Sequence, residues 1–424
     1  MLKMNNVLMI GGGVSGQAVA ELADALQISC RIVNDSINGN DDPETIFNNV
    51  DLVVVSPGVL PTSGLFNEAV KRKLEIISEL EFGIRYFPGK MVAVTGTNGK
   101  TTTVELTGFL LNKLGVQAIT AGNIGLPLSA VSAQIVRGEL PEAEALTAVL
   151  EISSFQLEHT HKLPLLAAVL LNVESDHINR YPGGMAEYRS VKERIFNEVA
   201  PEKRFYGMTM SGKNHCGDFS INNNALFCQG ELLLDLQKTA FKAPHNQENL
   251  LAALSLCQSV IGNLAEKCEP LREALGEFKT GDHRISTVGV FNGVTYIDDS
   301  KATNPAAVIA AVKSLEAVPR GNIILIAGGL DKDMDFSVLA TLRDYLKKVI
   351  VYGRCGANVA AAFAGKNEIF DAGNDFSLVV SEAVKSASAG DIVLLSPAAA
   401  SMDMFKDYKA RGNEFARLVK DLAG

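Results

Sequence analysis

The sequence predicts an α/β protein of three domains, in which mainly parallel β-strands alternate with helices. Short apolar runs rich in Val, Ile and Leu recur along the chain, and helical patterns separate them. Two of these runs end in glycine-containing loops that open a helix, at residues 11–16 and 96–99. The chain of 424 residues is too long for one ordinary core. Domains of about 100–200 residues suggest two to four, and we expect three.

Composition narrows the class of protein. A hydrophobic content of 47% and a charged content of 21% are typical of a globular chain. The net charge of −9 argues against general binding to nucleic acid or to an anionic membrane. The longest apolar run, residues 163–173, is far shorter than the roughly 20 residues that cross a bilayer. The six cysteines form no C-x-x-C pair, and no secretion signal is visible, so we expect reduced thiols and a cytoplasmic location.

The first domain, residues 1–88, is expected to be Rossmann-like. An apolar strand at residues 6–10 leads into the spacing G-x-G-x-x-G at residues 11–16, and a helical pattern follows. A second strand ends in an acid, Asp35. Taken alone, this pattern also fits an oxidoreductase with a nicotinamide or flavin cofactor. The same strand, turn and helix serve any ligand with phosphates or a ribose.

The first domain continues with a third strand at residues 51–55. It ends in Ser56-Pro57-Gly58, the kind of loop that lines the carboxyl edge of an open α/β sheet. Helix and short strand follow up to Phe87, and Pro88-Gly89 is the expected linker.

The central domain, residues 89–281, opens with a nucleotide phosphate loop. The apolar strand at residues 92–95 runs into Gly96–Thr102, which reads G-T-N-G-K-T-T, and then into a helix. The glycines let backbone N–H groups approach phosphate oxygens, Lys100 supplies a cation and Thr101 a hydroxyl for Mg²⁺. The common pattern G-x-x-x-x-G-K-[ST] would need a glycine at Val94, so the match to a general P-loop is partial.

The rest of the central domain predicts a parallel sheet with helices on both faces. We expect strands at residues 117–120, 148–152 and 167–172, a helix at 185–198, hairpin-like pieces at 203–243, and helices at 249–261 and 271–278. The C-terminal domain, residues 282–424, is expected to be a second Rossmann-like α/β unit. Its predicted strands lie at residues 294–297, 322–327, 348–352 and 391–395, with helices at 305–316, 336–346, 356–363 and 376–388.

Two acidic residues follow strands of the central domain. Glu151 follows the apolar strand at residues 148–150, and Asp176-His177 follow the strand at residues 168–173. In an open parallel sheet these ends converge on the edge that carries the phosphate loop, and hard oxygen ligands there suit Mg²⁺. Each could also be a capping acid or a surface histidine. The other histidines, at positions 159, 161 and 215, are interpreted as solvated.

Four motifs resemble one known family in that family's order. They are Gly96–Thr102, Ala121–Gly125 (A-G-N-I-G), Glu151–Leu157 (E-I-S-S-F-Q-L) and His245–Asn249, and together they resemble the Mur ligases of peptidoglycan synthesis. The likeness covers essentially the whole chain, and G-T-N-G-K-T-T is that family's own form of the loop. It implies one domain for a UDP-sugar, one for ATP and one for an amino acid.

The C-terminal motifs narrow the resemblance. Asp298–Asn304 (D-D-S-K-A-T-N) and Ser396–Asp403 (S-P-A-A-A-S-M-D) look like those of the member that adds D-glutamate to UDP-N-acetylmuramoyl-L-alanine. This implies an ATP-dependent ligase that works through an acyl phosphate. The alternatives are another amino-acid ligase of the superfamily, such as a folylpolyglutamate synthase, or a nucleotide-dependent binding module without chemistry.

The resemblance implies a role for each matching residue. Catalytic roles fall to Lys100, Glu151, His177 and Lys192, and metal ligation to Thr101, Glu151, His177 and Lys192, with two Mg²⁺ ions and a carbamylated Lys192. ATP would be bound by Gly96, Thr97, Asn98, Gly99, Lys100, Thr101, Thr102, Asn249, Arg284 and Asp299. The UDP-substrate would be bound by Ser15, Asp35, Ser36, Gly58 and Asn123, and the amino acid by Lys301, Thr303, Lys332, Ser401 and Tyr408.

Without the resemblance, Lys192 reads as a solvated helix lysine. Ile37 stands where relatives place an arginine, which puts stacking on the uracil in doubt. Tyr408 stands where a phenylalanine often flanks the D-glutamate pocket, and it preserves an aromatic wall. The expected partners are small-molecule substrates alone, and a monomer is expected.

Overall fold

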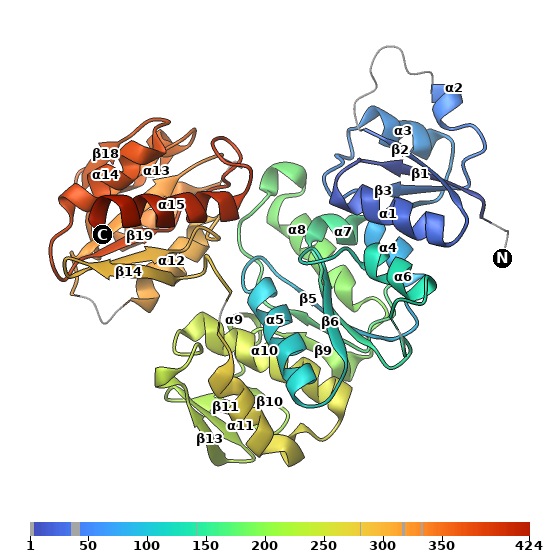
Figure 1. Ribbon diagram of the computed structural model, residues 1–424, viewed down its shortest axis with the longest axis horizontal. Coiled ribbons are helices and arrows are strands. Elements are labelled where there is room, and N and C mark those ends of the chain that lie inside the picture. Colours follow the sequence, from blue (N-terminus) through green and yellow to red (C-terminus); the bar gives the residue numbers. More distant parts are fainter. Residues whose placement is uncertain (1–3, 35–42, 141, 280, 316–318, 332–333) are drawn as a thin grey trace. The chain divides into compact units, whose positions relative to one another are not determined.

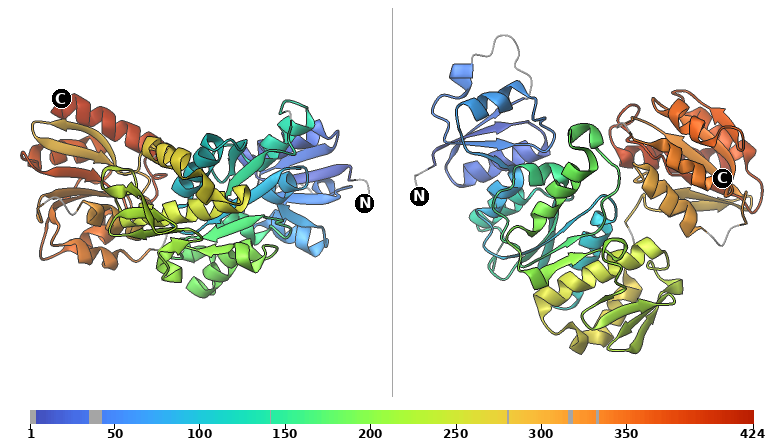
Figure 2. Two further views of the ribbon diagram at one scale, coloured as in Figure 1. Left: turned by 90° about the horizontal axis from the view of Figure 1, so that it is seen from below. Right: turned by 180° about the vertical axis from the view of Figure 1, so that it is seen from behind.

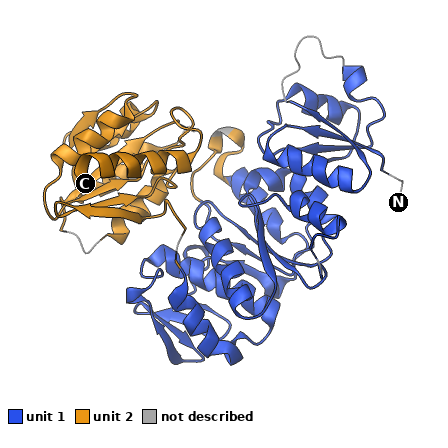
Figure 3. Ribbon diagram, viewed as in Figure 1, with its two compact units in different colours: residues 1–173, 186–278 blue, residues 174–185, 279–424 orange. Residues whose placement is uncertain are grey.

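The computed structural model describes residues 4–34, 43–140, 142–279, 281–315, 319–331 and 334–424. The chain divides into two compact units (Figure 3). Unit 1 contains residues 1–173 and 186–278, and unit 2 contains residues 174–185 and 279–424. Both contain parallel sheets flanked by helices, which confirms the predicted fold class. Within the described ranges, no helix is both long and apolar enough to cross a membrane.

The N-terminal part of unit 1 is a four-stranded parallel sheet in the order β2-β1-β3-β4 (Figure 1). Its strands are β1 (Asn6–Ile10), β2 (Ser29–Val33), β3 (Leu52–Val55) and β4 (Ile76–Ser78), and its helices are α1 (Val14–Ala25), α2 (Pro43–Ile46), α3 (Gly64–Lys71) and α4 (Glu79–Ile84). Alternate residues of each strand face opposite layers. Met9 packs with Val19 and Leu22 of α1, whereas Leu8 packs with Leu65 and Ala69 of α3.

Helix α4 fixes this sheet to the central part of unit 1. The buried Glu79 accepts a hydrogen bond from the Ser129 backbone N–H at 2.8 Å, at the start of α6 (Leu128–Val136). The buried Glu81 accepts one from the His161 N–H at 2.6 Å. Ala133 of α6 completes the core cluster that contains the α1 side chains. The two sheets therefore share packing and buried polar contacts, which explains why they form one compact unit.

The central sheet has five parallel strands in the order β6-β7-β5-β8-β9. They are β5 (Lys90–Thr95), β6 (Ala118–Gly122), β7 (Thr147–Glu151), β8 (Ala167–Leu170) and β9 (Arg204–Tyr206), and the connecting helices include α5 (Lys100–Lys113), α7 (Ser154–Glu158) and α8 (Gly184–Glu193). Val92 and Val94 of the middle strand point into the largest described core of this unit. The phosphate loop thus leaves a strand that has a neighbour on both sides.

A small antiparallel sheet, β10 to β13, follows the central one. Its strands are β10 (His215–Cys216), β11 (Phe219–Asn222), β12 (Ala225–Cys228) and β13 (Glu231–Asp235), next to α9 (Met208–Ser211), α10 (Pro244–Ile261) and α11 (Cys268–Glu277). Residues of this sheet, α10 and α11 share one hydrophobic cluster with α5. The predicted hairpin-like region and the two helices after it are confirmed.

Unit 2 contains a six-stranded sheet in the order β14-β15-β19-β16-β17-β18, with helices on both faces (Figure 2). Its elements are β14 (Ser286–Phe291), β15 (Val294–Asp298), α12 (Pro305–Ser314), β16 (Ile323–Gly328), η6 (Phe336–Leu342), β17 (Leu346–Tyr352), α13 (Gly356–Phe363), β18 (Glu368–Asp371), α14 (Phe376–Ser386), β19 (Ile392–Leu395) and α15 (Tyr408–Ala423). Only the β14–β15 pair is antiparallel among the described pairings of this sheet.

Several elements differ from the sequence expectation. The strands β14 and β18 and the final helix α15 were not predicted. The helix expected at residues 336–346 is a 3₁₀ helix that ends at Leu342, because strand β17 begins at Leu346. Helix α8 ends at Glu193, and a 3₁₀ turn, Arg194–Phe196, continues it. His159 is half-buried with its ring 5.0 Å from that of Phe66, so its assignment as solvated was wrong.

Candidate active site

The phosphate loop has the backbone that its glycines require. Gly99 is the N-cap of α5 with φ 84°, and Gly96 has φ 154°. Both lie in the region that disfavours side chains. A Cβ on Gly99 would lie 2.3 Å from Oδ1 of Asn249, so the loop packs directly against α10. The loop before α5 therefore requires glycine at positions 96 and 99, and it leads directly into the helix N-terminus, where an anion is favoured.

A residue that the sequence analysis did not single out holds this loop. Oδ1 of Asn172 accepts hydrogen bonds from the backbone N–H groups of Thr97 and Asn98, at 3.1 and 2.8 Å. Its Nδ2 donates to the Asn98 carbonyl at 3.2 Å. Asn172 follows β8, the neighbour of β5. A polar residue directly after an apolar strand beside the phosphate-loop strand is the signal that could have identified it.

The side chain of Lys100 lies over its own loop. Its Nζ donates to the carbonyl oxygens of Gly96 and Thr97, each at 2.9 Å. The next residues, Thr101 and Thr102, are buried at the start of α5. The loop thus gathers an ammonium group, a helix N-terminus and two hydroxyls within one turn, which is a favourable environment for phosphate.

Glu151 lies beside this loop because β7 pairs with β5, with Glu151 opposite Val94. Its side chain is 2% exposed. Oε1 accepts a hydrogen bond from Nδ2 of Asn123 at 2.8 Å, and among the described residues nothing donates to Oε2. A buried carboxylate oxygen without a donor needs a partner to balance its desolvation. The Glu151 carboxylate and the Thr101 hydroxyl are hard oxygen donors, so they fit Mg²⁺.

Magnesium usually needs few protein ligands. In the described part of the chain, no group of three or more His, Cys, Asp or Glu side chains is arranged to hold a metal ion. Mg²⁺ at nucleotide sites is commonly held by one or two side chains together with phosphates and water. The Glu151 and Thr101 pair matches that pattern better than an all-protein cage.

Lys192, near the end of α8, is not solvated. The lysine is 2% exposed, and its Nζ donates to the Gly96 carbonyl at 2.8 Å. The same Nζ lies 4.6 Å from the ring centroid of Tyr188, whose hydroxyl is 3.4 Å from Oγ1 of Thr97. The interpretation of Lys192 as an ordinary surface lysine was therefore wrong. The packing of α8 against the phosphate loop buries its amino group.

Asn249 meets the phosphate loop from α10. It is 3% exposed, and its Oδ1 accepts a hydrogen bond from Oγ1 of Thr103 at 3.3 Å. Its Nδ2 donates to Oδ1 of Asn246 at 3.2 Å. The structure thus brings Asn249, Lys192 and Glu151 to the same loop from three different elements.

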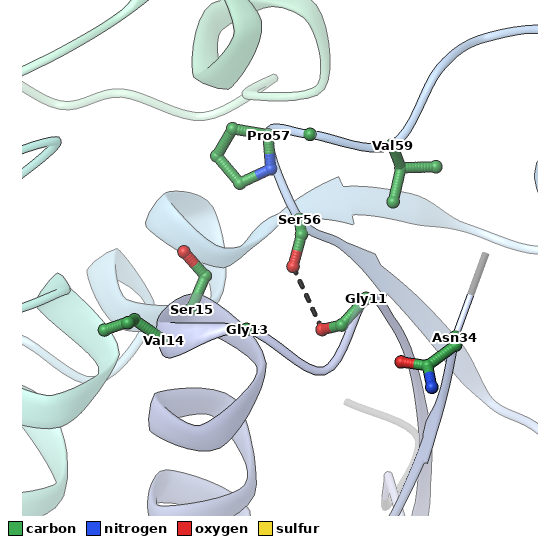
Figure 4. A pocket seen from close by; sticks show the side chains of 9 residues that line it. Gly11, Gly13, Val14, Ser15, Asn34, Ser56, Pro57 and Val59 are labelled. Carbon is green, nitrogen blue, oxygen red and sulfur yellow. Dashed lines mark hydrogen bonds between the residues drawn. The ribbon is translucent and has the colours of Figure 1, made fainter. Parts of the chain in front are cut away.

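A separate cavity of about 450 Å³ opens at the carboxyl edge of the N-terminal sheet (Figure 4). The predicted residues Ser15 and Gly58 line it, together with the unpredicted Asn34 and Ser56. Oγ of Ser56 donates to the Gly11 carbonyl at 3.1 Å. This hydrogen bond joins the loop after β3 to the loop after β1. Asn123 is not among the residues that line this cavity, and Asp35, Ser36 and Ile37 lie outside the described residues.

His177 lies in unit 2. It has left-handed backbone angles, φ 56° and ψ 26°, and it caps a 3₁₀ turn at Ile178–Arg180. Its Nε2 is 3.6 Å from Oδ1 of Asp176. The carboxylate of Asp176 and the imidazole of His177 therefore lie close together, and their convergence on the phosphate loop stays a prediction.

Arg284 and Asp299, two residues of unit 2 that are predicted to bind ATP, lie at the same end of the β14–β15 pair. Asp299, directly after β15, is 7% exposed. It accepts hydrogen bonds from Oγ of Ser396 at 2.8 Å and from the Ile285 N–H at 3.3 Å. Burial raises the pKa of Asp299 to about 7, and these donors and the Arg284 charge only partly oppose it. Ile285 has φ 49°, which is rare for a β-branched residue and marks strain beside Arg284.

Lys301 and Tyr408, which are both predicted to bind the amino acid, are in contact. The Lys301 Nζ lies 4.0 Å from the ring centroid of Tyr408. His283 makes an edge contact with the same ring, at 6.1 Å between centroids, and its Nδ1 is 2.6 Å from Oδ2 of Asp298. Thr303 is half-buried and Ser401 is buried, whereas Lys332 lies outside the described residues.

Arg411 contacts the segments next to Lys301 and Ser401, and the sequence analysis missed it. It is fully buried on α15. Its guanidinium donates to Oγ and the carbonyl of Ser300, at 2.9 and 2.8 Å, and to the Ala399 carbonyl at 3.1 Å. It therefore joins the segment before Lys301 to the segment before Ser401. A buried arginine is rare enough to notice, but a sequence does not show burial.

Comparison with known proteins defines the class. The family model for the Mur ligase middle domain matches residues 94–222, and the model for the Mur ligase glutamate ligase domain matches residues 283–399. Together with the relatives below, these matches show that the chain belongs to the Mur ligase family. This confirms the resemblance drawn from the sequence motifs.

Curated relatives narrow the class to one kind of member. The UDP-N-acetylmuramoylalanine–D-glutamate ligase of Nitrosospira multiformis is 36% identical over 408 residues, covering 89% of this chain and 83% of the relative. Those of Shigella sonnei and of Escherichia coli K12 are each 34% identical over 448 aligned residues, with 98% coverage of both chains.

Solved structures share the fold at lower identity. The UDP-N-acetylmuramate-alanine ligase MurC of Thermotoga maritima has a TM-score of 0.61 at 18% identity, covering 99% of this chain and 100% of that one. The MurF ligase of T. maritima, in complex with ADP, has a TM-score of 0.60 at 16% identity, covering 100% and 96%. The folylpolyglutamate synthase of Mycobacterium tuberculosis, complexed with ADP, gives 0.58 at 14%, covering 78% and 92%.

Proposed function

We infer that this chain is an ATP-dependent ligase that joins D-glutamate to UDP-N-acetylmuramoyl-L-alanine in peptidoglycan precursor synthesis. The observation that carries the inference is the phosphate loop, Gly96–Thr102, with the uncompensated Glu151 oxygen at its edge. The names of the relatives that align over nearly the whole chain supply the substrate.

The chemistry explains why such a site needs concentrated positive charge. A carboxylate does not react with an amine at neutral pH, because oxide is a very poor leaving group. Transfer of the γ-phosphoryl group of ATP to the carboxylate gives an acyl phosphate, which the amine of D-glutamate attacks. Amide, ADP and phosphate are the products. Three anionic reactants must therefore meet on a chain whose net charge is −9.

The residues of unit 1 would bind the nucleotide. We propose that Lys100 pairs with the β- and γ-phosphates and that the N–H groups of Gly96–Gly99 and the Thr101 and Thr102 hydroxyls complete the cradle. Thr101 and Glu151 would hold Mg²⁺, which neutralises charge on the phosphates when it is bound. Asn249 would approach the nucleotide from α10.

A second Mg²⁺ is proposed at His177 and Lys192. Carbamylation would turn the amino group of Lys192 into an anionic oxygen ligand, and its burial beside Gly96 supports this, because a buried ammonium is costly. His177 would complete the site.

The remaining roles follow the three-domain division at residues 1–88, 89–281 and 282–424, which we keep as a proposal. The UDP-substrate would lie on Ser15, Asp35, Ser36, Gly58 and Asn123. Arg284 and Asp299 would reach the γ-phosphate and the ribose. D-Glutamate would pair its two carboxylates with Lys301 and Lys332, against Thr303, Ser401 and Tyr408. We further propose a cytoplasmic monomer that binds no nucleic acid.

The deciding experiment measures phosphate release from ATP with UDP-N-acetylmuramoyl-L-alanine and a panel of amino acids. We expect turnover with D-glutamate and less than about 1% of that rate with L-glutamate, L-alanine or a diamino acid, because the pocket must pair both carboxylates in one configuration. Turnover with another amino acid but not D-glutamate would identify a different ligase of the family. Tight ATP binding with no phosphate release would indicate a binding module.

A further inference from the structure

Two thiols from different elements of unit 1 meet sulfur to sulfur. Cys228 ends β12, and Cys268 begins α11, forty positions later. Their Sγ atoms lie 2.8 Å apart. A disulfide bond is about 2.05 Å long, so the bond could form with a displacement of less than an ångström. This contact joins the small antiparallel sheet to the last helix of the unit.

The two thiols differ in their access to solvent. Cys228 is 7% exposed within the hydrophobic cluster that also contains Phe219 and Leu271. Cys268 is half-buried at the border of that cluster. Burial raises the pKa of the Cys228 thiol to about 12, and the Cys268 thiol and the charges of Asp218 and Glu231 act in the same direction. A dissolved oxidant therefore reaches the half-buried Cys268 before the buried Cys228.

We propose that Cys228 and Cys268 form an oxidisable dithiol that closes to an intramolecular disulfide when the chain meets a peroxide. Hydrogen peroxide oxidises the Cys268 thiol to a sulfenic acid and releases one water. The Cys228 sulfur then attacks the Cys268 sulfur, the S–O bond breaks, and a second water leaves with the Cys228 proton. Two electrons pass from the thiols to the peroxide, and contact between the sulfurs makes the second step effectively unimolecular.

The other cysteines lack this combination of access and contact. Cys257 and Cys355 are fully buried, and burial raises the pKa of each thiol. Cys216 is half-buried, and burial raises its pKa to about 11. Cys30 is half-buried on β2, in a different sheet, so it provides a matched control for simple oxidation.

The disulfide would have a measurable physical effect. It would close a loop of 40 positions that contains β13 and α10, and cross-linking a long loop stabilises the fold by restricting the unfolded chain. We expect the thermal midpoint to rise by roughly 5–10 °C. Because the readout is thiol content and stability, the result does not depend on the proposed ligase activity.

The test treats the whole native chain with increasing hydrogen peroxide, blocks remaining thiols with an alkylating reagent, and maps the peptides by mass spectrometry. We expect a mass loss of about 2 Da, a linked pair of peptides containing Cys228 and Cys268, and reversal by a thiol reductant. The C228S and C268S variants should lose the link and the rise in thermal midpoint, whereas C30S should keep both.

Three outcomes would overturn the proposal. The first is that Cys228 and Cys268 both remain open to alkylation, after denaturation, at peroxide levels that oxidise Cys30. The second is a link that joins a different pair of cysteines. The third is a thermal midpoint of treated wild-type chain that does not exceed that of treated C268S. If C228S fails to fold because its core position now carries a hydroxyl, C228A and C268A make the same comparison.

Discussion

The amino group of Lys192 lies 2.8 Å from the carbonyl oxygen of Gly96, and it is buried there. This relationship places a helix lysine against the first glycine of the phosphate loop, from an element ninety-six positions away. A group in this place acts directly on the loop geometry or on whatever the loop binds.

Replacement of Lys192 by arginine should lower the rate of phosphate release by at least about 100-fold. A guanidinium cannot be carbamylated, and it is too large for the site. With ¹³C-bicarbonate, wild-type chain should show a carbamate carbon signal that K192R lacks. The exposed Lys420, changed to arginine, is the control and should behave as wild type. Full activity of K192R would refute both the carbamate and the metal role.

Replacement of Glu151 by glutamine should leave the fold intact and lower phosphate release by about 100-fold or more. The amide oxygen can still accept the Asn123 hydrogen bond, but the second position becomes an N–H group that repels a cation. Steady-state rates across a Mg²⁺ titration measure the effect. The exposed Glu139, changed to glutamine, is the matched control. An unchanged Mg²⁺ dependence in E151Q would show that the ion is held elsewhere.

Replacement of Asn172 by alanine should raise the KM for ATP by about tenfold or more. The N–H groups of Thr97 and Asn98 lose the side-chain oxygen of Asn172 as an acceptor, and the Thr97 N–H keeps only the Asn172 backbone carbonyl at 3.0 Å, so the loop is held less firmly. The KM for the amino acid should change much less, and this difference separates a loop defect from general destabilisation. A variant with the wild-type KM for ATP would show that the loop is preorganised without Asn172.

Replacement of Arg411 by methionine should raise the KM for D-glutamate by about tenfold and lower stability by several kcal/mol, because buried acceptors on Ser300 and Ala399 lose their donor. The R411K variant should recover part of the lost stability, but its KM for D-glutamate should stay close to that of R411M. An ammonium group cannot reproduce the planar, forked set of donors of a guanidinium. Arg417, exposed on the same helix, is the control when changed to lysine. A normal KM in a folded R411M chain would contradict the positioning role.

Glu79 should give a pH-dependent stability. Burial raises its pKa from 4.5 to about 7, while the Ser129 hydrogen bonds only partly oppose it. The folded state therefore favours the protonated carboxyl, and this contribution is complete below pH 4.5 and is lost as the pH rises through 7. At about 1.4 kcal/mol for each pH unit, the loss is on the order of 3 kcal/mol.

Urea unfolding of wild type and E79Q between pH 4.5 and 8.5 measures this effect. The stability of wild type relative to E79Q should fall across that range and level off above pH 7. Asp299, whose pKa is also raised to about 7, is present in both chains and cancels in the difference. A difference that does not vary with pH would show that Glu79 keeps one charge state throughout.

Local sequence rules predicted the parts of this protein that depend on neighbours in the chain. The phosphate loop, the glycine turn at residues 11–16 and most strands of the parallel sheets are of this kind, because period, glycine and strand propensity are local properties. The edge strand β14 was not predicted, because Gly289 interrupts its short apolar pattern and the strand is only partly buried. Helix α15 was not predicted, although Phe415, Leu418 and Val419 recur at helical spacing and are buried on one face.

The site residues that were missed depend on contacts between distant segments. Arg411 acts on Ser300 across 111 positions, and Asn172 acts on Asn98 across 74. Lys192 was found by its likeness to a family, whereas reasoning from the residues alone placed it in solvent. In a sequence, an exposed helix lysine cannot be told from a buried helix lysine until the element that packs against it is known.

The buried carboxylates of α4 bear on how this chain could be divided or recombined. Glu79 and Glu81 supply acceptors to residues 129 and 161, so a fragment that starts at residue 89 would lose both hydrogen bonds and would expose the apolar side chain of Ala133, which packs with the first sheet. A boundary drawn at Pro88-Gly89 separates two sheets but not two folding units. Transplanting the first segment between relatives would succeed only if its receiving surfaces, near residues 128–133 and 159–162, travelled with it.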